Sequence, residues 1–158
     1  MSSDDVEYEA AVRAAREQAI KLLARREHAP MELSRKLGER GHESQAVEQA
    51  LAQLEADNLL SPARFAESFV RARVGRGKGP LLIRAELGAR RIAQEIVEQA
   101  LTEVGVDWAE LAREARIKRF GRPVPTDFSA QQKQRRFLQQ RGFDARHMRL
   151  AMSDQDDE

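Results

Sequence analysis

The sequence predicts an all-α fold of three tandem three-helix (helix-turn-helix-like) repeats in an elongated, curved array. Apolar residues recur at helical spacing, whereas alternating strand patterns and Asn-Gly or Asp-Gly hairpin turns are almost absent. The block Leu-Gly-Glu-Arg at 37–40 returns as Leu-Gly-Ala-Arg at 87–90 and as Leu-Gln-Gln-Arg at 138–141. A period of about fifty residues in a helical chain indicates stacked units that are too small to bury their apolar faces alone.

Nine helices are expected in chain order. They are placed at 9–27, 30–40, 44–57, 62–75, 80–90, 93–104, 108–120, 130–141 and 144–152. Pro30, Pro62 and Pro80 each stand at a first helical position, where the missing N–H costs nothing, and Ser61 is the N-cap before Pro62. The stretches Asp107–Glu110 and Ser129–Gln132 have the spacing of capping boxes.

Five segments follow from this reading. They are an N-terminal extension with the start of the first helix (1–15), repeats at 16–58, 59–105 and 106–152, and an acidic tail at 153–158, which is expected to be disordered.

The composition excludes several classes of protein. The 158 residues include no Cys, which rules out disulfides, thiolate metal sites and Cys nucleophiles and is typical of a reducing compartment. No apolar run approaches the roughly 18 residues that span a bilayer, and the first residues lack a secretory pattern. We expect a soluble, cytoplasmic protein that does not contact membranes.

Positive charge is concentrated in two blocks, although Lys+Arg (27) and Asp+Glu (26) nearly balance over the chain. Residues 71–91 hold seven basic side chains against one acid, and residues 113–149 hold eleven against three. Between them, residues 92–112 hold five acids and no base. Solvated helix faces could account for one such block, but two in one small chain favour an anionic ligand or an acidic protein surface as partner.

No residues are marked out for catalysis, metal or cofactor binding. The loop Gly75–Pro80 lacks the preceding strand and the Gly-Lys-Ser/Thr ending of a phosphate loop, so it is interpreted as a flexible connector that exposes Arg76 and Lys78. His28, His42 and His147 are far apart and have no companions at metal-ligand spacing. The chain is therefore expected not to be an enzyme and to need no cofactor.

Several stretches resemble one known family. They are Leu22–His28, Glu32–Leu37, Arg64–Arg73, Arg76–Pro80, Ile83–Leu87, Lys118–Gly121 and Arg136–Phe143. Over roughly residues 16–152 the chain is similar to the RecX family of regulatory proteins, which modulate the RecA recombinase. The resemblance implies tandem three-helix repeats. It also implies binding in the groove of the RecA–single-stranded DNA filament, with inhibition of ATPase, strand-exchange and co-protease activities.

The two basic blocks supply the candidate contacts for such a filament or its DNA. They are Arg71, Arg73, Arg76, Lys78, Arg84, Arg116, Lys118, Arg119, Arg135, Arg136 and Arg141. The expected partners are RecA and the single-stranded DNA within its filament, bound by a monomer. A module that binds naked DNA directly is the alternative, since three-helix units also occur in helix-turn-helix domains. A helical adaptor without a nucleic-acid role is a third possibility.

Overall fold

The fold is described by a computed structural model that covers residues 2–153. Those residues contain nine α-helices and no strand, so the expected all-α fold is confirmed. Apart from Ser153, the acidic tail expected at 153–158 lies outside the described residues. Within the described residues, no helix combines the length and the hydropathy that a membrane span requires.

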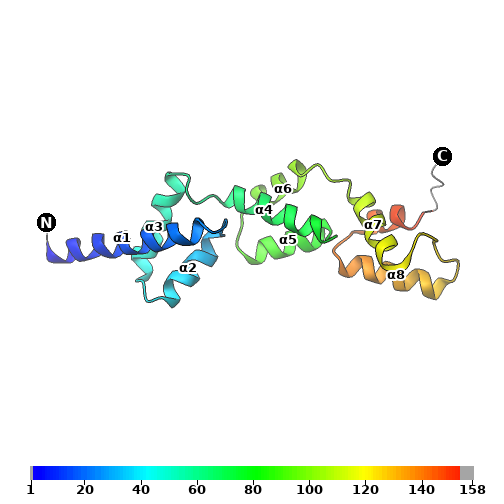
Figure 1. The fold of residues 1–158 in the computed structure, drawn as a ribbon, viewed down its shortest axis with the longest axis horizontal. Helices are drawn as coiled ribbons and strands as arrows, with labels where there is room; N and C mark the ends of the chain where they lie inside the picture. The colour runs from blue at the N-terminus through cyan, green and yellow to red at the C-terminus, as the bar shows by residue number, and fades with distance from the viewer. Residues whose placement is uncertain (1, 154–158) are drawn as a thin grey trace.

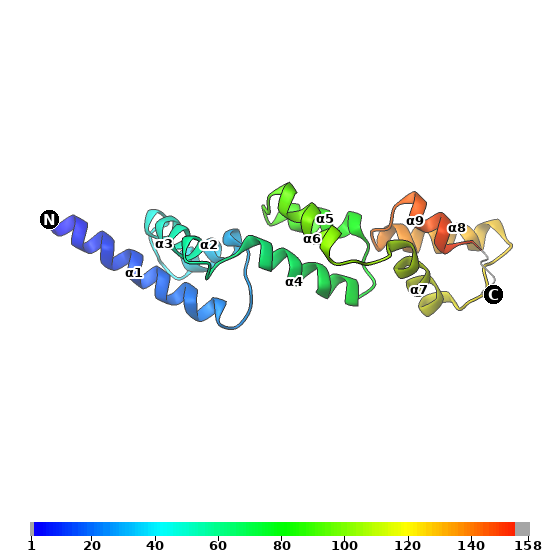
Figure 2. The ribbon, with the colours of Figure 1, turned by 90° about the horizontal axis from the view of Figure 1, so that it is seen from above.

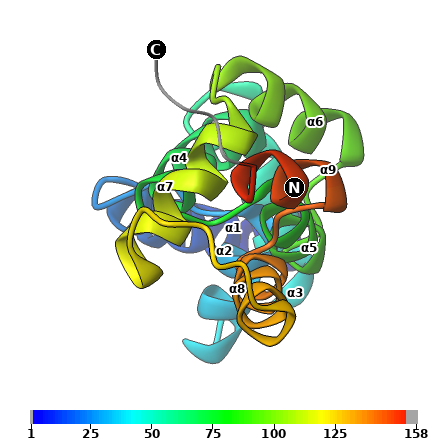
Figure 3. The ribbon, with the colours of Figure 1, turned by 90° about the vertical axis from the view of Figure 1, so that its right-hand side faces the viewer.

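The helices are grouped in threes along one axis (Figures 1 and 2). Their bounds are α1 Ser3–Leu23, α2 Pro30–Glu39, α3 Ser44–Ala56, α4 Pro62–Gly75, α5 Pro80–Ala89, α6 Gln94–Glu103, α7 Trp108–Phe120, α8 Phe128–Gln140 and α9 Ala145–Ala151. In each group the first helix packs mainly against the third, as α1 does against α3, α4 against α6 and α7 against α9. The view along the row shows the groups nearly behind one another, so the molecule is long and narrow (Figure 3).

Each repeat has a core of its own, and the recurring leucine lies in it. Leu37, Leu87 and Leu138 occupy equivalent positions in the three repeats, and all three are fully buried. The arginine three residues after each leucine is the C-cap of α2, α5 or α8. The period in the sequence therefore reflects one packing arrangement used three times.

Local start signals place most helices correctly. Pro30 and Pro80 are first residues of α2 and α5, and the Ser61 hydroxyl accepts a hydrogen bond from the backbone N–H of Arg64 at 3.1 Å. The Asp107 carboxylate accepts one from Glu110 N in the same way.

Two helix starts differ from expectation by two residues or more. α1 begins at Ser3 rather than at residue 9, because the Ser2 hydroxyl accepts from Asp5 N and the Asp5 side chain accepts from Ser2 N in a capping box. α8 begins at Phe128, because the Asp127 carboxylate accepts from Ala130 N and takes the capping role expected of Ser129.

One arginine bridges the first joint between repeats. Arg64 of α4 donates from Nε to Glu27 Oε1 at 2.9 Å and from Nη2 to the Asn58 carbonyl, also at 2.9 Å. Ala29, which precedes α2, is buried in the core of the second repeat rather than the first. These contacts tie the α1–α2 loop and the α3–α4 turn to the second repeat.

Candidate interface between the second and third repeats

The loop between α4 and α5 is docked against the third repeat. Gly79 N donates to the Arg141 carbonyl at 2.8 Å, and Leu81 N donates to the Gly142 carbonyl at 3.0 Å. In return Arg141 Nη1 donates to the Arg76 carbonyl at 2.9 Å. The expectation that Gly75–Pro80 forms a flexible connector is therefore wrong, since hydrogen bonds join this loop and the start of α5 to the residues that follow α8.

Two glycines permit this close approach. A Cβ on Gly79 would lie 2.5 Å from the carbonyl carbon of Gly142 and 2.7 Å from Phe143 N. Gly142 has φ +98°, which favours glycine, and a Cβ there would lie 2.7 Å from Leu82 N. The two backbones can pass at hydrogen-bonding distance only because neither residue carries a side chain.

A groove of about 630 Å³ lies beside this joint, between the end of α4, α7 and the end of α8. Its walls carry four basic side chains, Arg76, Lys118, Arg119 and Arg141, and one acidic one, Glu114. Arg76 comes from the first basic block and the other three from the second. The docked joint thus brings together charges that are about 40 to 65 residues apart in the sequence.

The four groove cations have no carboxylate partner among the described residues. Two of them are positioned by aromatic rings instead. The Arg141 guanidinium lies 5.0 Å from the Phe137 ring centroid and that of Arg119 lies 5.4 Å from Phe120. The two rings meet edge to face at 5.3 Å. Cation–π contact of this kind orients a guanidinium without neutralising its charge, which remains available to an anion.

Two other candidate residues are already paired within the second repeat. Arg73 Nη2 lies 2.8 Å from Glu86 Oε2, and its guanidinium stacks 4.2 Å over the Phe69 ring. Arg84 Nε lies 2.6 Å from Glu98 Oε1. An external anion would have to compete with these carboxylates, so both residues are weaker candidates than the groove cations.

The prediction that Arg116 contacts a partner is wrong. Its side chain is 1 % exposed, with Nε donating to the Ala151 carbonyl at 2.9 Å and Nη2 donating to the Arg122 carbonyl at 3.1 Å. Nη1 lies 3.3 Å from the Gly121 carbonyl. A guanidinium presents five donors in a rigid fork, and here they hold the α7–α8 loop and the end of α9 against α7. Arg116 is therefore a structural residue of the third repeat.

The remaining candidates stay predictions. Arg135 and Arg136 are exposed on α8 outside the groove lining, and Lys78 is half-buried in the docked loop. Arg71 is exposed beside Glu67 and Glu103 in a smaller hollow between α4 and α6. This acidic setting makes Arg71 the least suited of them to attract an anion.

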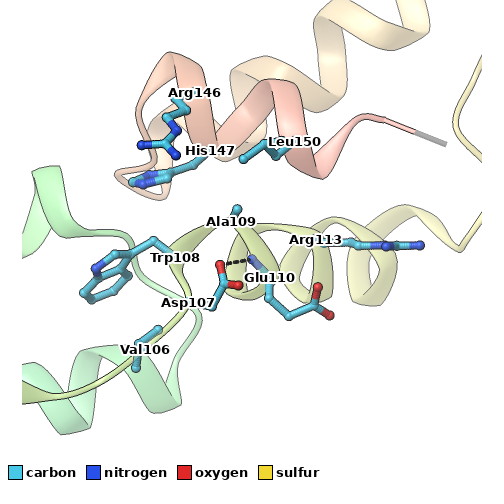
Figure 4. A pocket seen from close by; sticks show the side chains of 9 residues that line it. All are labelled: Val106, Asp107, Trp108, Ala109, Glu110, Arg113, Arg146, His147 and Leu150. Atoms are coloured by element: carbon cyan, nitrogen blue, oxygen red, sulfur yellow. Dashed lines mark hydrogen bonds between the residues drawn. The ribbon is translucent and has the colours of Figure 1, made fainter. Parts of the chain in front are cut away.

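A second hollow, of about 470 Å³, opens between α7 and α9 (Figure 4). Its charged side chains are of mixed sign, since Asp107, Glu110 and Arg113 of α7 line it together with Arg146 of α9. Asp107 also caps α7, as the dashed line in Figure 4 marks. Because its charges nearly balance, this hollow is less suited to an anionic partner than the groove.

Sequence reasoning missed the apolar floor of the groove. Val74, Leu111, Ala115 and Phe137 line it and are half-buried. Leu111 and Ala115 belong to the stripe Trp108, Leu111, Ala112 and Ala115, in which only Ala112 is fully buried. Helical periodicity finds such a stripe but does not tell a core position from a groove position.

Comparison with known protein families covers most of the chain. Models described as the first, second and third three-helix domains of RecX match residues 15–54, 63–101 and 106–152. A "Regulatory protein RecX" of Halorhodospira halophila is 46% identical over 151 residues, which is 94% of each chain.

Solved structures show the same fold. One "Crystal structure of regulatory protein RecX" superposes with a TM-score of 0.81 at 24% identity and covers 94% of this chain and 74% of that one. The structure of RecX from Lactobacillus salivarius superposes with a TM-score of 0.76 at 21% identity and covers 91% and 96%. Three matched domains and high identity over nearly the full length lead to one conclusion: this chain belongs to the RecX family of regulatory proteins.

Proposed function

We propose that this protein binds the RecA–single-stranded DNA filament as a monomer and lowers its ATPase, strand-exchange and co-protease activities. The observation that carries the proposal is the groove between the second and third repeats, in which four cations from both basic blocks converge, none of them with a carboxylate partner among the described residues. A long, narrow scaffold suits a helical groove, because its repeats could contact successive protomers of a filament.

Inhibition by this route needs no catalytic residue. A regulator that binds an inactive or disassembling filament more tightly than the active one shifts the population towards the inactive state. The size of the shift is limited by the difference between the two affinities.

The test is a titration of this protein into a RecA–single-stranded DNA ATPase assay. We expect hydrolysis to fall with increasing protein. The variant Lys118→Glu/Arg119→Glu, which reverses two exposed groove cations, should need at least about tenfold more protein for half-inhibition. The matched control is Lys133→Glu/Arg149→Glu, which makes the same charge change at two exposed positions of the third repeat outside the groove.

Unchanged hydrolysis at saturating protein contradicts the proposal. The alternative of a direct DNA-binding module predicts tight binding to naked DNA with a steep dependence on salt. The filament proposal predicts weaker binding to naked DNA and a clear gain when RecA is present. Fluorescence anisotropy on one labelled oligonucleotide, with and without RecA, separates the two.

A further inference from the structure

We propose that the groove between the second and third repeats binds a short acidic peptide segment that carries one large apolar side chain, rather than nucleic acid. This inference rests on the proposed function, because it assigns the groove to the protein component of the partner. The volume of about 630 Å³ lies within the range of about 300–1,000 Å³ usual for ligand-binding clefts.

The floor of the groove provides a place for an apolar side chain. Val74, Leu111 and Ala115 line the groove with aliphatic surface beside its four cations. Leu or Phe seated there would remove its own surface and that of the floor from water, which the sugar–phosphate backbone cannot do. A peptide brings apolar and anionic groups within one or two residues of each other, so one short segment can meet both the aliphatic and the cationic lining.

Guanidinium groups already lie over the aromatic rings near the groove. A base would gain affinity by stacking on a ring, as it does in proteins that bind single strands. Phe137 lies under the Arg141 guanidinium and packs against Phe120, which lies under Arg119. Stacking a base on either of these faces would first displace a guanidinium.

Glu114 also favours a peptide over nucleic acid as the ligand of the groove. Its exposed carboxylate lies in the groove wall among the four cations and repels a phosphodiester. A peptide in the groove can offer backbone N–H donors to this carboxylate while its Asp or Glu side chains meet the cations. One carboxylate acceptor beside four cationic donors therefore fits a peptide better than a phosphate chain.

The proposal is tested by measuring the affinity of three probes for the full-length protein in the absence of RecA. The probes are a fluorescein-labelled hexapeptide, Asp-Glu-Leu-Phe-Asp-Glu, the same peptide with Ser-Ser in place of Leu-Phe, and an oligothymidylate of equal net charge. We expect the first peptide to bind at least about tenfold more tightly than the other two, since burial of one large apolar side chain is worth at least that factor. In ¹H–¹⁵N spectra its amide shifts should centre on Gly77, Leu111 and Ala115.

Matched variants locate the effect. Lys118→Glu/Arg119→Glu should lower the affinity for the first peptide by about tenfold or more, whereas Lys133→Glu/Arg149→Glu should change that affinity by less than about threefold. Glu114→Gln should improve binding of the oligothymidylate more than that of the peptide, since the peptide loses the charged acceptor of its backbone N–H groups together with the repulsion, whereas the oligothymidylate loses only the repulsion.

Three outcomes overturn the inference. They are equal affinity for the two peptides, tighter binding of the oligothymidylate at the same amides, or peptide-induced shifts that lie outside the groove. Each can occur while the protein still inhibits RecA ATPase, in which case the proposed function stands and only the choice of ligand fails. Conversely, peptide binding without ATPase inhibition removes the proposed function and leaves the groove as a peptide site.

Discussion

Gly79→Ala offers the sharpest test of the joint between the second and third repeats. Gly79 has φ −91° and ψ 171°, a conformation open to alanine, so the substitution introduces no backbone strain of its own. The substitution is destabilising for a steric reason, because the new Cβ would lie 2.5 Å from the carbonyl carbon of Gly142 and 2.7 Å from Phe143 N. Both neighbours are backbone atoms that a rotamer change cannot move aside, so the repeats must separate.

The expected loss can be worked from the bonds that separation breaks. Gly79 N to the Arg141 carbonyl (2.8 Å) and Leu81 N to the Gly142 carbonyl (3.0 Å) are backbone hydrogen bonds across the joint. Each contributes about 1 kcal/mol net. The partly exposed bond from Arg141 to the Arg76 carbonyl adds up to a similar amount. We expect Gly79→Ala to lower the free energy of unfolding by about 2–3 kcal/mol.

The assay combines urea denaturation with residue-resolved amide exchange. Exchange is needed because a chain of repeats can lose a joint without unfolding as a whole, and a single midpoint would then be ambiguous. The amide of Leu81 should lose protection, while those of Leu37 and Val47 in the first repeat should keep theirs. The control is Gly88→Ala in α5, where a Cβ meets nothing within 4 Å, and which should stabilise the chain by about 0.5–1 kcal/mol.

Unchanged protection of Leu81 in Gly79→Ala, with a free energy of unfolding within about 0.5 kcal/mol of the wild type, would refute the reasoning. Such a result means that the joint does not depend on the close approach of the two glycines.

Two further changes probe individual side chains. Arg116→Met should lower the free energy of unfolding, measured by urea denaturation, by about 3 kcal/mol or more, because it leaves buried carbonyl oxygens of the α7–α8 loop and of α9 without donors. A loss below about 1 kcal/mol is incompatible with a structural role for Arg116. Burial lowers the pKa of His28 in the folded chain. Below about pH 6.5, the ordinary pKa of histidine, His28 therefore takes up a proton in the unfolded chain more readily than in the folded chain. The free energy of unfolding consequently decreases as the pH falls from about 6.5 through the lowered pKa of the folded chain. The urea midpoint should therefore drop between pH 7.5 and pH 5, and His28→Gln should make this drop smaller; an identical drop in the variant contradicts the assignment to His28.

The sequence by itself determined the helices and their grouping. Pro30, Pro80 and the cap at Ser61 act within one turn, and buried leucines at about fifty-residue spacing place equivalent helices in three small cores. Both signals are local or periodic, so they can be read without knowing which residues meet across the fold. Where a competing cap lay a few residues away, as Asp127 does before Ser129, the same reasoning misplaced a boundary.

The candidate site was decided by tertiary structure. Arg116 and Arg119 lie one turn apart on α7 and look alike in the sequence, yet only Arg119 is exposed. The difference arises because the α7–α8 loop and α9 fold over Arg116 and supply it with carbonyl acceptors. Likewise, Arg76 and Arg141 meet only because Gly79 and Gly142 let two backbones from different repeats form hydrogen bonds. Contacts between residues so far apart in the chain depend on the packing of complete repeats, which no local pattern encodes.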